Sequence, residues 1–276
     1  RIKGTFDDCQ DIVKEAFHER TFLHNNQYLL AVNSINWVRI IGQICYYFYA
    51  SLKVSNLKES NNFSVPTGNF GNVFACYAAH KMGLPVNKII VSVNSNDILN
   101  RFFNNNDYSK QKVNETASPS MDISVASNFE RLIYDLYCDR DSNACNEFYS
   151  SFPDKPINLP VDIWKKSKEL FLSYAVNDHQ TINAIQKIYS LYNYLIDPHT
   201  AVALVAVDEI SAKNSSKTIV LSTAHPAKFP ESIADAGIEM NDIPKKLSDV
   251  FDKEERAFSL LPDKNSIFKF ISDNNF

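Results

Sequence analysis

Glycine is scarce in this chain. Only 6 of its 276 residues are glycine, where an average share of about 7% would give roughly nineteen. Long apolar runs are also missing: the best, Ile40 to Leu52, contains a glutamine and several tyrosines. A membrane-spanning helix needs about 20 predominantly apolar residues, so the composition excludes the membrane as a partner. The few glycines should therefore lie where the backbone requires them.

Cysteine pairs and an excess of basic residues are absent as well. The five cysteines are scattered and form no Cys-x-x-Cys motif, which favours free thiols in a reducing compartment, the cytoplasm, over a disulfide framework. The net charge is -4, and this argues against nucleic acid as a partner. No two histidines have the spacing of metal ligands, so no metal site is predicted.

The region from residue 63 to 93 has the pattern of a βαβ unit. We expect a strand at Phe63–Pro66, a loop at 67–72, a helix at 73–82 that ends at Gly83, and an apolar β-branched strand at 88–93. A strand, helix and strand in this order predict a parallel sheet.

The rest of the chain is predicted to be mainly helical. Ile35 to Lys53 reads as a long helix that is apolar on most faces and therefore buried. Ser127 to Ala212 reads as helical almost throughout, and Thr218 to Thr223 as another strand. The length fits one large or two modest domains.

The loop between the first strand and its helix carries the strongest chemical signal. It reads PTGNFGN, and it contains Gly68 and Gly71, two of the scarce glycines. Glycines allow unusual dihedrals that point successive amides inward, and a helix start adds a partial positive charge, so the loop can bind a phosphate without lysine or arginine. It lacks the Gly-Lys-Ser/Thr of a P-loop and the GxGxxG of a dinucleotide fold. From composition alone, an ordinary strand–turn–helix corner is the favoured interpretation, and a phosphate site is the alternative.

Six segments resemble one enzyme family, in the family's order and over nearly the whole chain. They are GTFDDCQDIV at 4–13, NSINWVRIIGQ at 33–43, VPTGNFGN at 65–72, MDISVASNFER at 121–131, DPHTAV at 197–202 and STAHPAKF at 222–229. These segments resemble the threonine synthases, which are pyridoxal-phosphate enzymes of fold type II (tryptophan synthase β-like). One departure is Ala203 after DPHTAV, where the family usually has glycine; this puts only local helix packing in doubt.

The resemblance implies an α/β fold with a parallel-sheet core and an extended helical insertion at about 127–212. It implies that residues 1–60 are the end of a smaller domain with a connecting helix, and that 61–276 are the large cofactor-binding domain. The cofactor, pyridoxal 5′-phosphate, would be held at its phosphate by the glycine loop and at its pyridine nitrogen by the Thr223 hydroxyl. The loop residues implied are Gly68, Asn69, Phe70, Gly71 and Asn72.

The start of the long helix resembles the family's substrate site. Ser34 and Arg39 would bind the phosphate of O-phospho-L-homoserine, with Asn33 and Asn36 nearby. Helix capping alone explains Ser34 equally well. His199, between a proline and a helix start, is predicted to be a packing or capping group and not a catalytic base.

The family's Schiff-base lysine lies in a T-x-A-F-K-D-like motif, which these 276 residues lack. We therefore expect this chain to be a fragment without a catalytic residue, inactive alone, whose partner is the preceding part of the same enzyme. By resemblance, the intact lyase acts in threonine biosynthesis and converts O-phospho-L-homoserine and water to L-threonine and phosphate. The alternatives are a phospho-lyase that releases 2-oxobutyrate, and a non-catalytic pseudoenzyme that serves as an interaction surface.

Overall fold

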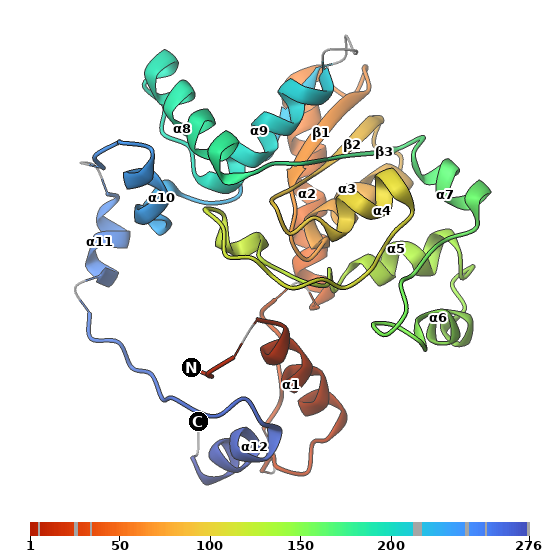
Figure 1. Ribbon diagram of the computed structural model, residues 1–276, viewed down its shortest axis with the longest axis vertical. Helices are drawn as coiled ribbons and strands as arrows, with labels where there is room; N and C mark the ends of the chain where they lie inside the picture. Colours follow the sequence, from red (N-terminus) through yellow and green to blue (C-terminus); the bar gives the residue numbers. More distant parts are fainter. Residues whose placement is uncertain are drawn as a thin grey trace. The chain divides into compact units, whose positions relative to one another are not determined.

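The computed structural model describes residues 1–276 except 5, 25–26, 34, 212–216, 241–242, 252 and 275–276 (Figure 1). The chain forms two compact units, one of residues 33–242 and one of residues 1–32 with 243–276. The division at residue 60 that the resemblance implies concerns the family's domains and stays a prediction.

The unit that joins the two ends of the chain is helical. Its helices are α1 (Phe6–His18), α11 (Lys245–Phe251) and α12 (Lys264–Asp273). The rings of Phe22 and Phe268 stack with their centroids 4.1 Å apart. Lys264 adds ion pairs with Glu15 of α1 and with Glu19, which follows the helix. Apolar stacking and solvated ion pairs thus hold α12 to α1 and to the segment that follows it.

The larger unit is built on a four-stranded parallel sheet. Its strands are β1 (Asn61–Pro66), β2 (Val86–Val93), β3 (Phe171–Ala175) and β4 (Thr218–Val220), in the order β3-β2-β1-β4. Helix α3 (Gly71–Lys81) connects β1 to β2. The predicted βαβ unit and parallel sheet are therefore confirmed. All six residues of β1 are buried, as expected for a strand in the middle of such a sheet.

The expectation that residues 127–212 are helical almost throughout is wrong at β3. This strand pairs with β2, and the Ser173 hydroxyl donates to the Val91 carbonyl at 2.8 Å. A short apolar run does not distinguish a buried strand from a buried helix by periodicity, which is why β3 was missed. The helices of the stretch are α5 (Phe129–Leu136), α6 (Ser142–Tyr149), α7 (Val161–Ser167), α8 (Asp178–Tyr192) and α9 (Pro198–Ser211).

The connections determine which helices cover which face of the sheet. The chain runs from β1 through β2 to β3 by way of α3 and α4 (Ile98–Asn105), and then crosses back to β4 by way of α8 and α9. Parallel crossovers are right-handed, so the reversal of direction puts α9 on the face opposite α3 and α4. Helix α9 packs on β1, β2 and β3 (Figure 1). The carboxyl ends of β1 and β4 are neighbours at one edge, where open parallel sheets bind ligands.

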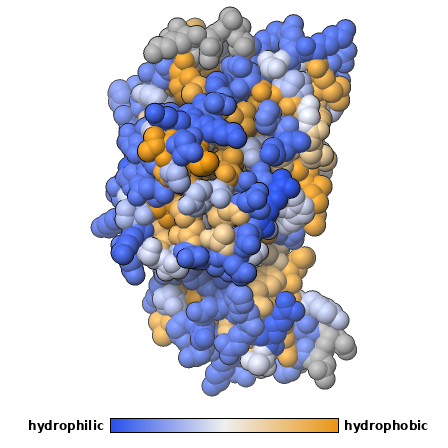
Figure 2. All heavy atoms as spheres, turned by 90° about the vertical axis from the view of Figure 1, so that its right-hand side faces the viewer, coloured by the Kyte–Doolittle hydropathy of each residue, from blue (hydrophilic) through white to orange (hydrophobic). Residues whose placement is uncertain are grey.

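The long helix of the larger unit is α2 (Trp37–Ser55), and its predicted burial is wrong. One stripe alone is buried, formed by Ile40, Ile44, Tyr47 and Ser51 at helical spacing. Other apolar residues of the same helix are exposed, namely Trp37, Val38, Ile41, Tyr46, Tyr49, Leu52 and Val54. Figure 2 shows apolar residues among hydrophilic ones on the side that it views. Apolar character on most faces of α2 therefore does not mean burial on most faces.

Candidate cofactor and substrate site

The loop between β1 and α3 leads into a helix start without a side-chain cap. The Thr67 amide donates to the Ser92 carbonyl at 2.8 Å, which ties the loop to β2. The N-cap of α3 is Phe70, whose side chain makes no capping hydrogen bond. The first amides of a helix have no intrahelical acceptor and carry a partial positive charge. The start of α3 therefore has the properties of an anion site.

The unusual backbone dihedrals of this loop belong to Phe70 and not to its glycines. Phe70 lies in the left-handed region at φ 65° and ψ -2°, whereas neither Gly68 nor Gly71 has a positive φ. The expectation that the glycines supply these dihedrals is thus wrong. A left-handed residue followed by a right-handed one points successive amides into a concavity that suits an anion. The Phe70 ring is 1% exposed and meets the Phe129 ring edge-on at 5.4 Å, so core packing offsets the strain.

Gly68 lies in a tight contact with another backbone segment, which leaves little room for a side chain. A Cβ atom at this position would lie 3.1 Å from the Met121 Cα and 3.1 Å from the Ser120 carbonyl oxygen. Both are backbone atoms of η1 (Pro119–Met121), a 3-10 turn that lies against the loop. The loop therefore packs closely on η1 at Gly68, and a methyl group there would press on the backbone of the turn.

Two other loop residues are held by side chains that the sequence did not single out. The Asn69 carbonyl accepts from the Asn128 amide and from Asn128 Nδ2, both at 3.0 Å. Asn72 Oδ1 accepts from the Tyr47 hydroxyl at 2.8 Å and also from the Tyr46 hydroxyl of α2. Although part of Tyr46 is exposed, desolvation raises its pKa, which keeps the hydroxyl protonated as a donor. Asn128 lies in one of the six family-like segments, but its contact with Asn69 spans too much sequence to be read from a pattern.

Thr223 follows β4 at the carboxyl edge of the sheet. The strand ends at Val220, earlier than predicted, and the Leu221 amide still donates to the Ser64 carbonyl of β1 at 3.0 Å. Ser222 Oγ then lies 3.3 Å from the Thr200 hydroxyl oxygen of α9. Thr223 itself is exposed. The structure thus puts Thr223 and the glycine loop after adjacent parallel strands.

The predicted substrate residues lie around the start of α2. The N-cap is Asn36, whose Oδ1 accepts from the Val38 amide at 3.0 Å, and Asn33 Oδ1 accepts from the Ile35 amide at 3.0 Å. The expectation that Ser34 caps this helix is wrong, because the N-cap is Asn36. Ser34 itself lies outside the described residues, and its role at a phosphate stays a prediction. Arg39 is exposed, and its charge opposes the rise in the pKa of Tyr46 that burial causes. Arg39 is therefore near the face of α2 that holds Asn72.

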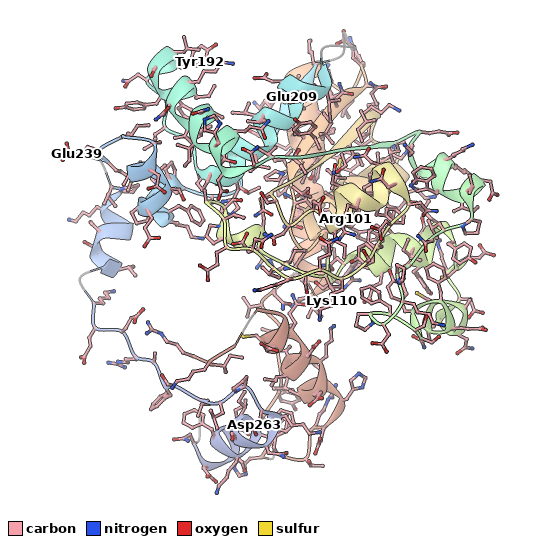
Figure 3. All side chains as sticks on the ribbon, in the orientation of Figure 1. Arg101, Lys110, Tyr192, Glu209, Glu239 and Asp263 are labelled. Carbon is pink, nitrogen blue, oxygen red and sulfur yellow. The ribbon has the colours of Figure 1, made fainter. Side chains whose placement is uncertain are left out.

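A second polar cluster follows β2 at the same edge. Asn94 Nδ2 donates to Asp122 Oδ1 at 2.8 Å, and Asn96 Nδ2 donates to the same oxygen at 2.9 Å. Arg101, labelled on α4 in Figure 3, donates to Asp107 Oδ2 at 2.8 Å and to the Ser109 carbonyl at 2.7 Å. These bonds fix the polar segment that leads to the 3-10 turn beside Gly68.

The described part of the chain has neither a membrane-spanning helix nor a cluster of metal-ligating side chains. Within it, no helix is long and apolar enough to cross a membrane. The same residues contain no group of three or more His, Cys, Asp or Glu side chains arranged for a metal ion.

Comparisons with known proteins identify the family. Residues 200–271 match the family model described as "Threonine synthase, C-terminal". The chain is 44% identical over 275 residues to a threonine synthase of Pseudomonas aeruginosa and 39% identical over 291 residues to one of Saccharomyces cerevisiae. The chain belongs to the threonine synthase family. It spans 58% and 55% of the length of these two relatives, and 99% and 98% of this chain is covered.

Solved threonine synthases have the same fold. A pyridoxal-phosphate-bound threonine synthase from Brucella melitensis matches 99% of this chain with a TM-score of 0.86 and 35% identity, and 58% of that chain is covered. The Escherichia coli threonine synthase matches with a TM-score of 0.78 and 30% identity, and 57% of its chain is covered. The predicted fold class, an α/β fold of the fold type II pyridoxal-phosphate enzymes, is confirmed.

Proposed function

We propose that this chain supplies the phosphate-binding part of a pyridoxal-phosphate-dependent threonine synthase, acting in the cytoplasm. The observation that carries the proposal is the uncapped start of α3 behind the left-handed Phe70. The cofactor phosphate is a dianion at neutral pH, and it suits a cradle of peptide amides. The relative from Brucella melitensis, with the same fold, is named as pyridoxal-phosphate-bound.

The roles of the loop residues follow from their backbone geometry. The amides of Gly68, Asn69, Phe70, Gly71 and Asn72 would hold the phosphate, while the Phe70 ring anchors the loop in the core. Tyr46 and Tyr47 hold the Asn72 oxygen, so they orient its amide group. Gly68 packs so closely on η1 that a Cβ would lie 3.1 Å from two backbone atoms, and this contact fixes the position of the loop.

Thr223 would accept or donate a hydrogen bond at the pyridine nitrogen. A neutral hydroxyl does not force protonation of the ring as a carboxylate does. When bound, the cofactor supplies an electron sink for carbanions at the substrate's α and β carbons. The position of Thr223 after β4, adjacent to β1, supports this role.

The substrate would be O-phospho-L-homoserine, which reacts with water to give L-threonine and phosphate. Arg39 offers a guanidinium for the substrate phosphate, and Asn33 and Asn36 lie in the turn before it. The family's lysine motif is not among these 276 residues, so the complete reaction also needs a segment that carries it. Product analysis of a protein with both parts separates threonine from 2-oxobutyrate, the product of a phospho-lyase. Formation of neither product would favour the pseudoenzyme.

The binding test compares pyridoxal 5′-phosphate with pyridoxal, which lacks the phosphate. We expect this chain to bind the phosphate ester more tightly than pyridoxal, and Gly71→Asp to remove the difference because a carboxylate then faces the phosphate. Gly42→Asp is the matched control: it adds the same charge at an exposed glycine of α2 with no atom within 4 Å of its Cβ position. Equal affinity of wild type and Gly71→Asp for the phosphate ester would refute the loop assignment.

A further inference from the structure

A buried carboxylate–imidazole pair lies at the start of α9. The Asp197 side chain is 1% exposed and the His199 side chain 5%. Asp197 Oδ1 lies 2.9 Å from the His199 backbone nitrogen and 2.9 Å from His199 Nδ1. The Thr200 hydroxyl donates to the other oxygen of Asp197. Asp197 therefore caps the helix start and also binds the imidazole.

The other nitrogen of His199 binds a different segment of the chain. His199 Nε2 accepts a hydrogen bond from the Ser120 amide at 3.2 Å. A ring nitrogen that accepts from an N–H carries no proton, so the ring proton is on Nδ1 and is donated to Asp197. His199 is thus a neutral bridge from Asp197 to the backbone of η1. With Nε2 occupied in this way, the structure supports the predicted packing role of His199 and not that of a base.

The segment that His199 holds is the one that packs on the glycine loop. The Ser120 carbonyl oxygen and the Met121 Cα each lie 3.1 Å from the position of a Cβ at Gly68. The Met121 side chain is 3% exposed and packs with Val202 of α9 and with Val176. Helix α9 therefore fixes η1 twice, once through His199 and once through Val202.

We propose that Asp197 and His199 are positioning residues for a phosphate monoester bound by the glycine loop. They fix the Ser120–Met121 backbone against Gly68, and this contact sets the direction of the loop amides. The proposal rests on the proposed function of the loop and adds two residues to it. Capping of α9 needs only Asp197, so the Nε2 contact with another segment is unexplained by capping.

Two substitutions of His199 separate its two hydrogen bonds. His199→Asn keeps an amide donor near the position of Nδ1 and removes the acceptor for the Ser120 amide. His199→Gln brings an amide oxygen to the position of Nε2 and restores that acceptor. His179→Asn, on the exposed surface of α8, is the matched control.

The first readout is hydrogen exchange of the Ser120 amide, which needs no ligand. We expect faster exchange in His199→Asn and near wild-type protection in His199→Gln. The second readout is the affinity for pyridoxal 5′-phosphate and for pyridoxal. We expect His199→Asn to weaken the binding of pyridoxal 5′-phosphate by about tenfold, because the buried Ser120 amide loses its acceptor. The affinity for pyridoxal should not change. His199→Gln should stay close to wild type for both ligands.

The outcomes distinguish the inference from the function on which it rests. Wild-type chain that does not prefer the phosphate ester over pyridoxal refutes the loop assignment, whatever the variants do. If wild type shows the preference but His199→Asn keeps it in full, the positioning role is refuted. The proposal is also refuted if the Asn and Gln variants lose the same affinity for the phosphate ester and exchange the Ser120 amide equally fast. His199 would then act only by packing.

Discussion

Gly68→Ala should push the glycine loop and η1 apart by a few tenths of an ångström. The new methyl carbon would lie 3.1 Å from the Met121 Cα and from the Ser120 oxygen, whereas ordinary contacts are 3.4–4 Å. A few tenths of an ångström must therefore come from the backbone. η1 does not give way freely, because the Ser120 amide is bonded to His199 at 3.2 Å and the Met121 amide to the Ser118 carbonyl at 3.0 Å.

The cost of this overpacking is about 1–3 kcal/mol. If the cradle opens to relieve it, the amides turn away from the phosphate. The affinity for pyridoxal 5′-phosphate then falls by about 5- to 140-fold, at about 1.4 kcal/mol per factor of ten. Any part of the cost that remains in the free protein lowers the melting temperature by about 2–4 °C per kcal/mol.

The assay is equilibrium binding of the phosphate ester and of pyridoxal, with thermal unfolding of the same samples. Gly42→Ala is the matched control: the Cβ position at Gly42 has no atom within 4 Å, and alanine should stabilise α2 by about 0.5–1 kcal/mol. We therefore expect Gly68→Ala to lower the melting temperature and Gly42→Ala to raise it. Gly68→Ala with wild-type affinity and an unchanged melting temperature would refute the steric reasoning.

Three further results are expected. Arg39→Ala should raise the KM for O-phospho-L-homoserine in a protein that carries the lysine segment and leave cofactor affinity alone; a normal KM would contradict its role at the substrate phosphate. Burial raises the pKa of Asp135, but hydrogen bonds from Tyr77 and Arg140 outweigh burial, so the net pKa lies below its ordinary value of 3.8. These contacts therefore stabilise the fold fully at pH values above 3.8. The stabilisation is lost as the pH falls through the lowered pKa. Urea unfolding of Asp135→Asn should therefore differ most from wild type near neutral pH; a difference that grows in acid would reverse the sign. Burial raises the pKa of Cys145 to about 12, so the exposed Cys45 should react first with a thiol reagent, and an unaltered fast phase in Cys45→Ser would contradict this.

The sequence predicted the parts of the fold that local chemistry determines. The βαβ unit was predictable because Pro66 and Gly83 mark the ends of its strand and helix and because the second strand is β-branched. The strand at Phe171–Ala175 was missed because its apolar residues run into helical patterns on both sides. The burial of α2 was overestimated because apolar residues lie around the whole helix, while only one stripe meets the sheet unit's core.

The candidate site was also predictable only in part. The helix start after the glycine loop was predictable from a short local motif, whereas α2 starts at Trp37 after an Asn36 cap and not at Ile35 as predicted. Contacts that join distant segments were not predictable, such as Asn128 with Asn69 or His199 with Ser120. The left-handed Phe70 was also beyond prediction, because a phenylalanine adopts this conformation only when tertiary packing compensates for it.

The Phe70 ring has a consequence for engineering this protein. Its neighbours Phe103, Phe129 and Phe171 belong to α4, α5 and β3, and none of them is in the loop. Replacing one of them with a smaller residue would let the ring shift and the backbone relax toward commoner dihedrals. Under the proposed function, a core substitution of this kind would lower the affinity for the cofactor phosphate without altering any residue of the loop itself.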